Sequence, residues 1–326
     1  GRVGPRPRPE SAAAARLDED SVAADAGLIS ASVSRAISAR LDTSDGRPYA
    51  RTSEEDTMTS GDEFLSEEIL GYGAYICARP AGDRDVRRAG AAITKTAERL
   101  GLRNEWEAAA PAERESFAFV RAERAIPADI ADDDVARARW LIHVCSKRAE
   151  SVTALCDAAA KALNDVAHLK ILRGVIRPRN YTGAAMANWA YGRQVVQQPG
   201  PAMPNAFFVP MSKTPEWWSK TWMERHTYFL PRYDDAGRMV NEGHALATAA
   251  GIPCLLRRTY KSETHPPAAG QYEFLTYFEC ADLAIPVFHQ VCAALRDVKR
   301  NPEWRFVREG PTWQGRRVPT WDALFE

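Results

Sequence analysis

The sequence has no excess of charge of either sign. Its 326 residues carry 43 lysines and arginines against 43 aspartates and glutamates, and its isoelectric point is about 7.2. Proteins that bind nucleic acid or acidic membranes through charge carry a basic excess, so we expect neither partner. The sequence also lacks an apolar run of roughly 18 residues, the length of a membrane-spanning helix, so we expect no membrane partner.

Paired cysteines are also missing, because none of the six cysteines belongs to a CxxC motif. They are scattered through apolar strand or helix patterns, with one at a predicted strand end: Cys77, Cys145, Cys156, Cys254, Cys280 and Cys292. Cysteines in such settings act as small hydrophobic residues in a reducing compartment. We therefore predict a cytoplasmic protein whose cysteines share neither a metal ion nor a disulfide.

Residues 1–60 have few large apolar side chains and are rich in Ala, Arg, Ser, Asp and Pro. Such a segment buries too little apolar surface to offset its ordering entropy, so we expect a largely disordered N-terminal extension. It has neither the apolar core of a secretory signal nor the acid-poor composition of a transit peptide. A helix over 28–41 is the exception, because apolar residues recur there at Ile29, Val33, Ile37 and Leu41.

The hydrophobic pattern becomes regular from about residue 68 and predicts a first unit with the order strand–helix–strand–strand–helix–strand. Alternating or continuous apolar residues predict the strands, and apolar stripes of helical period predict the helices. The predicted elements are strand 71–79, helix 86–100, strands 116–125 and 139–147, helix 152–163 and strand 168–176.

A Pro- and Gly-containing linker, 197–204, precedes a second unit of the same order. Its predicted elements are strand 205–212, helical sequence as far as His244 and beyond, paired strands 254–260 and 272–279, helix 284–298 and a closing strand 303–309. Two copies of this split βαβ unit predict an α+β fold of tandem ferredoxin-like halves, residues 68–182 and 205–317. We expect their sheets to face each other, with the helices outside.

Two adjacent arginines lie in the strand 254–260. Because side chains alternate along a strand, Leu255, Arg257 and Thr259 share one face, and Arg258 lies on the other. One guanidinium therefore points toward the interior and needs an anion or a strong acceptor. A structural ion pair and a binding role both remain open for it.

Two further features are ambiguous by themselves. His244 lies among alanines, which leave room beside its ring for something flat and large, although a packed histidine is the simpler interpretation. Lys213 precedes Trp217 and Trp218, and such a tryptophan pair fills a core or an interface. With the lysine, it could also hold the acidic edge of a large apolar cofactor.

Four motifs taken together resemble the chlorite dismutase family over about four-fifths of the chain. "RPRNYTG" (177–183) resembles its haem-edge segment, and "KTPEWW" (213–218) its lysine followed by two tryptophans. The thirteen positions from His244 to Arg257 match the offset between proximal ligand and distal arginine, and "FLTYFE" (274–279) matches a distal-pocket strand. The resemblance implies a dimeric α+β barrel within one chain.

The resemblance also implies functional roles. It makes His244 the ligand of a haem b iron and Arg257 the catalytic residue over the open iron face. The residues around the haem would be Asn180, Tyr181, Lys213, Trp217, Trp218, Thr276 and Phe278. It implies an oxidoreductase that activates a small molecule or anion such as chlorite, peroxide or a nitrogen oxide, in a homo-oligomer.

Departures from the family pattern leave alternatives open. The segment 219–243 is longer than in the family, and its His226 becomes a rival ligand. Arg300 aligns with the family's proximal glutamate, and Glu303 is the candidate to replace it. Coproheme decarboxylases carry a redox tyrosine where this chain has Val209, which argues against that activity. A haem carrier or sensor remains the non-enzymatic alternative.

Overall fold

The computed structural model describes residues 68–81, 86–106, 115–126, 129–177 and 203–326. Every described residue belongs to one compact unit, residues 57–326. The predicted extension 1–60 and its helix 28–41 lie outside the described residues, as does most of the linker 197–204. No helix in the described ranges is long and apolar enough to cross a membrane.

The first half of this unit has the predicted order of elements. Its main elements are β1 (Gly71–Pro80), α3 (Ala89–Arg99), β3 (Ser116–Ile126), β4 (Trp140–Ser146), α5 (Ala149–Leu163) and β5 (Ala167–Ile176). A short strand β2 (Arg103–Asn104) pairs parallel to β3, and a short helix α4 (Asp133–Ala136) precedes β4. The four long strands are antiparallel and lie in the order β5–β1–β4–β3.

The second half repeats this arrangement of strands. Its main elements are β6 (Asn205–Lys213), β9 (Leu256–Lys261), β10 (Phe274–Cys280), α10 (Ile285–Arg296), β11 (Val307–Glu309) and β12 (Thr312–Val318). Its four long strands lie in the order β9–β10–β6–β12, again antiparallel, and β11 pairs with β6. The α+β class predicted from the sequence is confirmed.

The two sheets join at their edges into one closed barrel within the chain, as the family resemblance implied. β12 pairs with β3 from Thr312–Ile126 to Val318–Phe119, and β9 meets β5 at Val175–Lys261. The ring runs β6–β10–β9–β5–β1–β4–β3–β12 and back to β6. Closure leaves no free edge among these eight strands.

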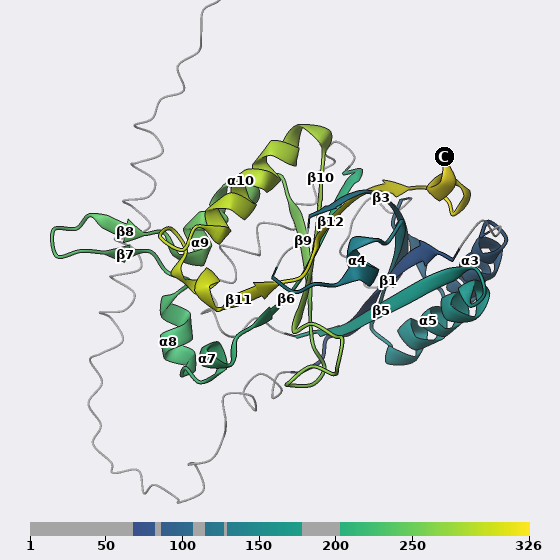
Figure 1. Ribbon diagram of the computed structural model, residues 1–326, viewed down its shortest axis with the longest axis horizontal. Helices are drawn as coiled ribbons and strands as arrows, with labels where there is room; N and C mark the ends of the chain where they lie inside the picture. The colour runs from purple at the N-terminus through teal and green to yellow at the C-terminus, as the bar shows by residue number, and fades with distance from the viewer. Residues whose placement is uncertain (1–67, 82–85, 107–114, 127–128, 178–202) are drawn as a thin grey trace, which may run out of the picture. The chain divides into compact units, whose positions relative to one another are not determined.

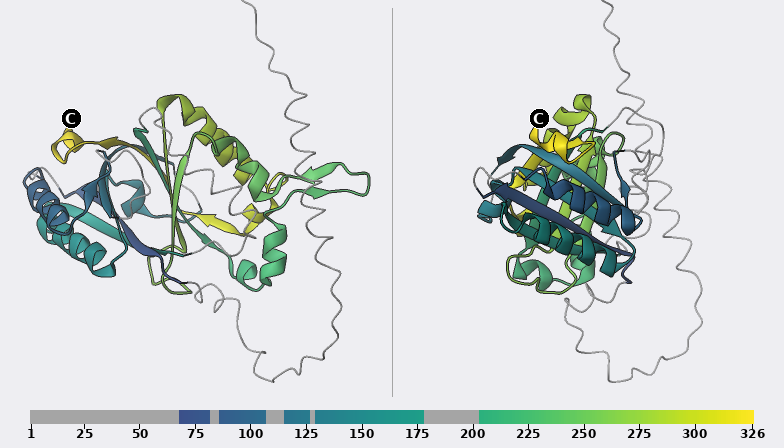
Figure 2. Two further views of the ribbon diagram at one scale, coloured as in Figure 1. Left: turned by 180° about the vertical axis from the view of Figure 1, so that it is seen from behind. Right: turned by 90° about the vertical axis from the view of Figure 1, so that its right-hand side faces the viewer.

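The long helices α3, α5 and α10 lie outside the barrel, as predicted, on opposite sides of it (Figures 1 and 2), whereas Val135 of α4 packs with residues of the barrel interior. Side chains alternate along β1, so that Ala74 and Ile76 pack against α3 and α5 while Tyr75 and Cys77 point into the barrel. On the other side, Phe207 of β6 packs against Phe288 of α10 with ring centroids 3.7 Å apart. Buried side chains therefore pack against the inner face of the barrel wall and, beneath the helices, against much of its outer face.

The strand that closes the ring is not the one that the sequence predicts. Residues 303–309 were expected to form it, but Pro302–Phe306 is a 3-10 helix, η4, and only Val307–Glu309 is extended. The closing strand is β12, whose sequence TWQGRRV alternates poorly in polarity. Its polar residues find partners inside the barrel and at its rim, such as Arg317 with Glu279 at 2.9 Å.

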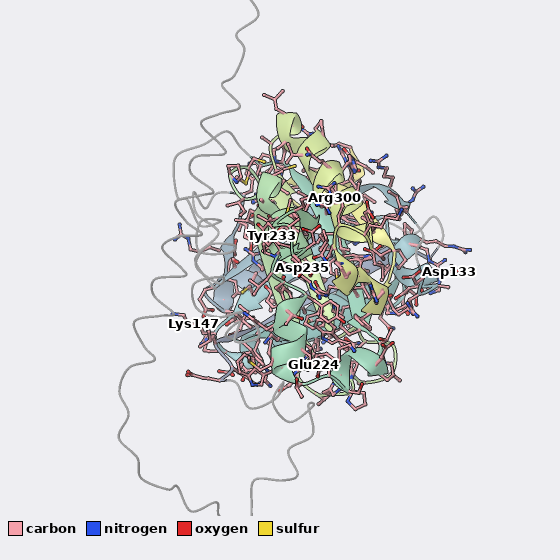
Figure 3. The ribbon with its side chains drawn as sticks, turned by 90° about the vertical axis from the view of Figure 1, so that its left-hand side faces the viewer. Asp133, Lys147, Glu224, Tyr233, Asp235 and Arg300 are labelled. Atoms are coloured by element: carbon pink, nitrogen blue, oxygen red, sulfur yellow. The ribbon has the colours of Figure 1, made fainter. Side chains whose placement is uncertain are left out.

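The segment before His244 is not continuous helix, contrary to the prediction. It contains α7 (Pro215–Trp218), α8 (Trp222–Thr227), the hairpin strands β7 (Arg232–Tyr233) and β8 (Met239–Asn241), α9 (Gly243–Ala247) and η2 (Ala249–Gly251). Figure 3 shows Glu224 of α8 together with Tyr233 and Asp235 of the hairpin at one end of this unit. Gly243 has φ of 62° and its Cα lies against the Leu230 carbonyl, so the bend before α9 requires glycine.

Candidate functional site

His244 lies near the start of α9 and has one occupied and one open ring nitrogen. Its Nδ1 lies 2.7 Å from Oε2 of Glu303, and its side chain is 10% exposed. Its Nε2 is buried and has no hydrogen-bond partner among the described residues. The backbone holds the ring in place, since its N–H donates to the Tyr228 carbonyl at 3.1 Å and Phe229 packs against the ring.

Glu303 links His244 to Lys213. Its other carboxylate oxygen, Oε1, accepts from Nζ of Lys213, whose side chain also lies over the Trp217 ring at 4.3 Å. Burial alone would raise the pKa of Glu303, but Lys213 and His244 lower it to about 2. The carboxylate is therefore ionised and favours the His244 tautomer with its proton on Nδ1, which leaves a lone pair on Nε2.

Glu303, rather than Arg300, is the residue that faces His244. Arg300 instead donates from Nε and a terminal nitrogen to the Glu242 carboxylate, both at 2.9 Å. The η4 turn brings Glu303 inward, to 3% exposure. The linear spacing that pointed to Arg300 could not reveal this turn, although Glu303 was the candidate replacement.

A largely apolar cavity lies between the outer face of the second-half sheet and the helices α9 to α10. It contains about 560 Å³ of empty space, part of it open to solvent. Its lining residues are Val209, Met211, Thr248, Gly251, Leu255, Arg257, Thr276, Phe278, Val291, Cys292, Leu295, Trp304 and Glu309. Its lining of apolar side chains with a few polar groups is typical of pockets for small organic ligands.

The cavity gathers predicted residues from two strands and one helix. Arg257 of β9 and Thr276 and Phe278 of β10 lie in its wall. Thr248 lines it from the end of α9, and this residue lies one helical turn after His244, on the same face. Arg257 thus lies on the sheet side of the cavity, while His244 is not among the lining residues and lies one helical turn before Thr248 on the opposite, helical side.

Strand alternation separates the two arginines as predicted. Arg257 faces the cavity, while Arg258 points into the barrel and donates to Oε1 of Glu105 at 3.0 Å. Arg258 is the interior guanidinium, and Glu105 is the anion that it requires. Glu105 comes from the first half, far away in the sequence, so its pairing was not visible there.

The tryptophans lie beside the cavity, not in its lining. Trp217 is 4% exposed and packs against Phe229 and Phe306, behind His244 and Lys213. Trp218 donates from Nε1 to Glu273 at 2.8 Å. Asn180 and Tyr181 lie outside the described residues. His226, the rival ligand, is half-buried on α8 near Trp222 and is not among the cavity residues.

Glu309 is a cavity residue that the sequence analysis missed. It ends β11, and its carboxylate accepts from Nε of Arg296 at 2.9 Å. Burial raises its pKa, although Arg296 opposes the shift. The sequence placed it in a closing strand, and only its pairing with Met211 of β6 brings it to the cavity rim.

Comparison with known proteins identifies the fold. No family model and no curated protein matches the sequence. Solved structures of chlorite dismutase from Candidatus Nitrospira defluvii do match. A doubly substituted variant and one with an arginine replaced by lysine each share 18% identity, cover 81% of this chain and 98% of theirs, and give a TM-score of 0.54. The complex with imidazole shares 19% identity over the same coverage, with a TM-score of 0.51. The chain therefore has the fold of chlorite dismutases.

Proposed function

We propose that this chain is a haem b-dependent oxidoreductase of the chlorite dismutase type, which activates a small oxidised ligand such as chlorite, a peroxide or a nitrogen oxide. The observation that carries the proposal is the buried Nε2 of His244. This atom has no hydrogen-bond partner among the described residues, while Glu303 fixes the other nitrogen. A buried polar atom without a partner is costly, and a metal–ligand bond would remove that cost.

The residues present fit a porphyrin. A neutral imidazole is a common haem ligand. Among the described residues no group of three or more His, Cys, Asp or Glu side chains could hold a bare metal ion, so a single histidine needs a macrocycle to complete the coordination. The cavity beside His244 is largely apolar, as the porphyrin face requires.

Glu303 and Lys213 would tune the histidine. The Glu303 carboxylate holds the proton on Nδ1 and makes Nε2 more electron-donating, the usual role of a carboxylate hydrogen-bonded to a metal-binding imidazole. Lys213 keeps that carboxylate ionised and oriented. This assigns Lys213 a role behind the histidine, whereas the sequence resemblance implied contact with the porphyrin edge.

Arg257 would hold the substrate. Haem, when bound, supplies an iron centre at which an oxygen–halogen, oxygen–oxygen or oxygen–nitrogen bond is activated. A guanidinium in an apolar cavity attracts a small oxyanion strongly, because little water competes with it. Phe278 and Thr276 shape the surroundings of that anion. Arg257 can also retain a charged leaving group by hydrogen bonding until it reacts again.

The proposal extends to architecture and setting. The two halves would be tandem ferredoxin-like repeats, which their matching strand orders support. The protein would be a cytoplasmic homo-oligomer that acts on a small molecule or anion.

Haem titration monitored by absorption tests the proposal. Wild type and His226→Ala are expected to give the same Soret band, and His244→Ala is expected to lose it or to shift it. Equal spectra for wild type and His244→Ala would refute the ligand assignment. A shift of the Soret band in His226→Ala alone would indicate that His226 of α8 is the iron ligand.

Product assays distinguish the activities. Release of oxygen from chlorite above the rate of free haem supports the chlorite version, and abolition by Arg257→Ala supports the role of the arginine. Incubation with iron coproporphyrin and peroxide tests the decarboxylase alternative, and mass spectrometry is expected to show no haem b, because Val209 cannot be oxidised as a tyrosine can. Haem exchange without turnover would indicate a carrier or sensor.

A further inference from the structure

The barrel interior contains a polar cluster that the proposed function does not use. His143 of β4 is fully buried, and its Nε2 lies 2.7 Å from the hydroxyl of Tyr260 of β9. Its Nδ1 lies 3.2 Å from Oε1 of Glu105. Glu105 also accepts from Ser116 at 2.6 Å and from Arg258 at 3.0 Å. Tyrosine, imidazole and carboxylate therefore form one chain of contacts.

The fold makes space specifically for the Tyr260 ring. A Cβ on Gly73 of β1 would lie 2.1 Å from Cζ of Tyr260, and one on Gly174 of β5 would lie 2.8 Å from Cβ of Tyr260. Side chains at either position would therefore collide with this tyrosine. The two glycines lie on first-half strands, so Tyr260 crosses from the second half into a niche of the first.

The protonation states suit proton transfer from Tyr260 to His143. Burial lowers the pKa of His143, an effect that Glu105 opposes, so the ring is neutral and can accept a proton. Burial would raise the pKa of Glu105, but Arg258 and His143 hold it well below its usual range. Glu105 lies 3.2 Å from Nδ1 of His143 and favours the proton on that nitrogen, while a terminal nitrogen of Arg258, which can only donate, lies 3.1 Å from Nδ1 and 3.3 Å from Nε2 and opposes it. Proton transfer requires the tautomer protonated on Nδ1, in which the Nε2 lone pair faces the phenol. Glu105 would stabilise the imidazolium, and Arg258 would oppose it.

Aromatic contacts connect this niche to the cavity. Tyr277 lies on β10 between the cavity residues Thr276 and Phe278, and its ring stacks on His143 at 5.9 Å. Tyr75 lies 5.6 Å from both Tyr277 and Tyr260. The niche and the cavity thus lie on opposite faces of the same strands, β9 and β10.

We propose that Tyr260 is a redox-active tyrosine, which gives one electron to a peroxide-oxidised haem in the cavity and its phenolic proton to Nε2 of His143. The O–H bond of Tyr260 breaks and an N–H bond forms on the imidazole. Tyr260 would thereby become a neutral tyrosyl radical, and a bound haem previously oxidised by peroxide would take up its electron. A phenol loses an electron more readily when a base takes its proton in the same event. The inference rests on the proposed haem function.

Tyr75 provides a matched control. It is also a fully buried tyrosine of the same cluster, but its hydroxyl has no hydrogen-bond partner among the described residues. Oxidation of Tyr75 would leave its proton without an acceptor. Tyr75→Phe therefore removes a hydroxyl from the cluster without removing the tyrosine–histidine pair.

Electron paramagnetic resonance of the haem-loaded chain, frozen after mixing with hydrogen peroxide, tests the inference. Wild type and Tyr75→Phe are expected to show a tyrosyl signal, and Tyr260→Phe is expected to lose it. In wild type the signal is expected to appear more slowly in D2O, because a proton moves with the electron. This last measurement needs no substitution, so it stands even if Tyr260→Phe fails to fold.

The outcomes separate the two proposals. A chain that gives no Soret band and no change in His244→Ala overturns both. A chain that binds haem through His244 but shows no tyrosyl signal, or shows an undiminished signal in Tyr260→Phe, overturns only the role of Tyr260. A signal that forms at the same rate in D2O overturns the transfer of its proton to His143.

Discussion

Two buried histidines in this molecule have the same kinds of neighbours but differ at one atom. His244, outside the barrel, and His143, inside it, each place Nδ1 beside a buried glutamate, at 2.7 and 3.2 Å. Each glutamate pairs with a cation, Lys213 or Arg258. At Nε2 they differ, because that of His143 meets Tyr260 at 2.7 Å and that of His244 has no partner among the described residues.

The difference follows from where each histidine lies. His143 points into a closed ring of strands, where a polar atom has no water and must be paired within the protein. His244 lies on a short helix beside a cavity, where a ligand can supply the missing partner. The same imidazole–carboxylate–cation arrangement thus serves an internal pair in one place and a binding site in the other.

Removing the glutamate carboxylate beside each histidine is expected to have the largest effect and tests whether His244 and His143 differ in function. Glu303→Gln removes the carboxylate that pairs with Lys213, and Glu105→Gln removes the carboxylate that pairs with Arg258. Each substitution leaves a buried cation beside a neutral amide. Each is expected to lower the free energy of unfolding by about 3–5 kcal/mol. Only Glu303→Gln is expected also to weaken haem binding, by roughly 10–100-fold. Denaturant unfolding and haem titration measure the two effects.

A comparable loss of haem affinity in both variants would contradict the separation of the two sites. Glu279→Gln is a third variant for the same assay, because Glu279 is a buried carboxylate that pairs with Arg317 and touches neither histidine. It is expected to reduce stability without weakening haem binding.

Filling the Tyr260 niche sharpens the comparison from the barrel side. Gly73→Ala places a methyl group in the Tyr260 ring and is expected to destabilise the chain by about 1–3 kcal/mol. The effect should shrink in a Tyr260→Leu background, because the colliding ring is then absent. Thermal unfolding of the two single variants and the double variant gives the coupling. If the effects of the two substitutions on the free energy of unfolding simply add, the Tyr260 ring is not the reason why position 73 requires glycine.

The free energy of unfolding is expected to depend on pH through the protonation of His143. Its folded pKa lies below the ordinary value, so the unfolded chain binds a proton first as the pH falls. The stability that the neutral ring contributes is present above about pH 6.5 and is lost as the pH falls below it, by at most about 1.4 kcal/mol per pH unit. The free energy of unfolding of His143→Gln is expected to depend less on pH between 7 and 5. An unchanged slope would contradict a neutral buried His143.

The smallest expected effect concerns the helix behind His244. Thr221 and Glu224 form a capping box at the start of α8, whose following residues Tyr228 and Phe229 accept the N–H groups of His244 and Ala245. Thr221→Ala is expected to cost about 1 kcal/mol. Hydrogen exchange should rise at residues 222–229 and 243–247 and stay unchanged around His143. Equal increases in both regions would argue against a local effect.

Much of the fold could be predicted because strands and helices leave local patterns. The alternation in "CLLRRTY" placed Arg257 and Arg258 on opposite faces, and the structure does so. The strand β12 escaped prediction because its polar residues point at partners supplied by distant strands. The hairpin before His244 escaped because β7 and β8 are too short to show a period.

The candidate site was predicted unevenly for the same reason. The spacing from His244 to Arg257 identified one cavity residue, Arg257, and a histidine one turn before the cavity residue Thr248, but no spacing pointed to Glu309. Glu303 was a candidate beside Arg300, and the choice depended on which of them the η4 turn carries inward. The number of residues between two positions does not show which side chain points inward when the chain turns between them.

The sequence alone determined the α+β class, the two similar halves and the opposite faces of Arg257 and Arg258, because these depend on local periodicity, and its resemblance implied a barrel. Tertiary structure alone decided which strand closes that barrel and which distant charges meet, as in Glu303 with His244 and Glu105 with Arg258. Burial makes such pairings obligatory, yet the identity of each partner depends on the register of strands far apart in the chain. For this reason Nε2 of His143 is paired with Tyr260, whereas Nε2 of His244 has no partner among the described residues.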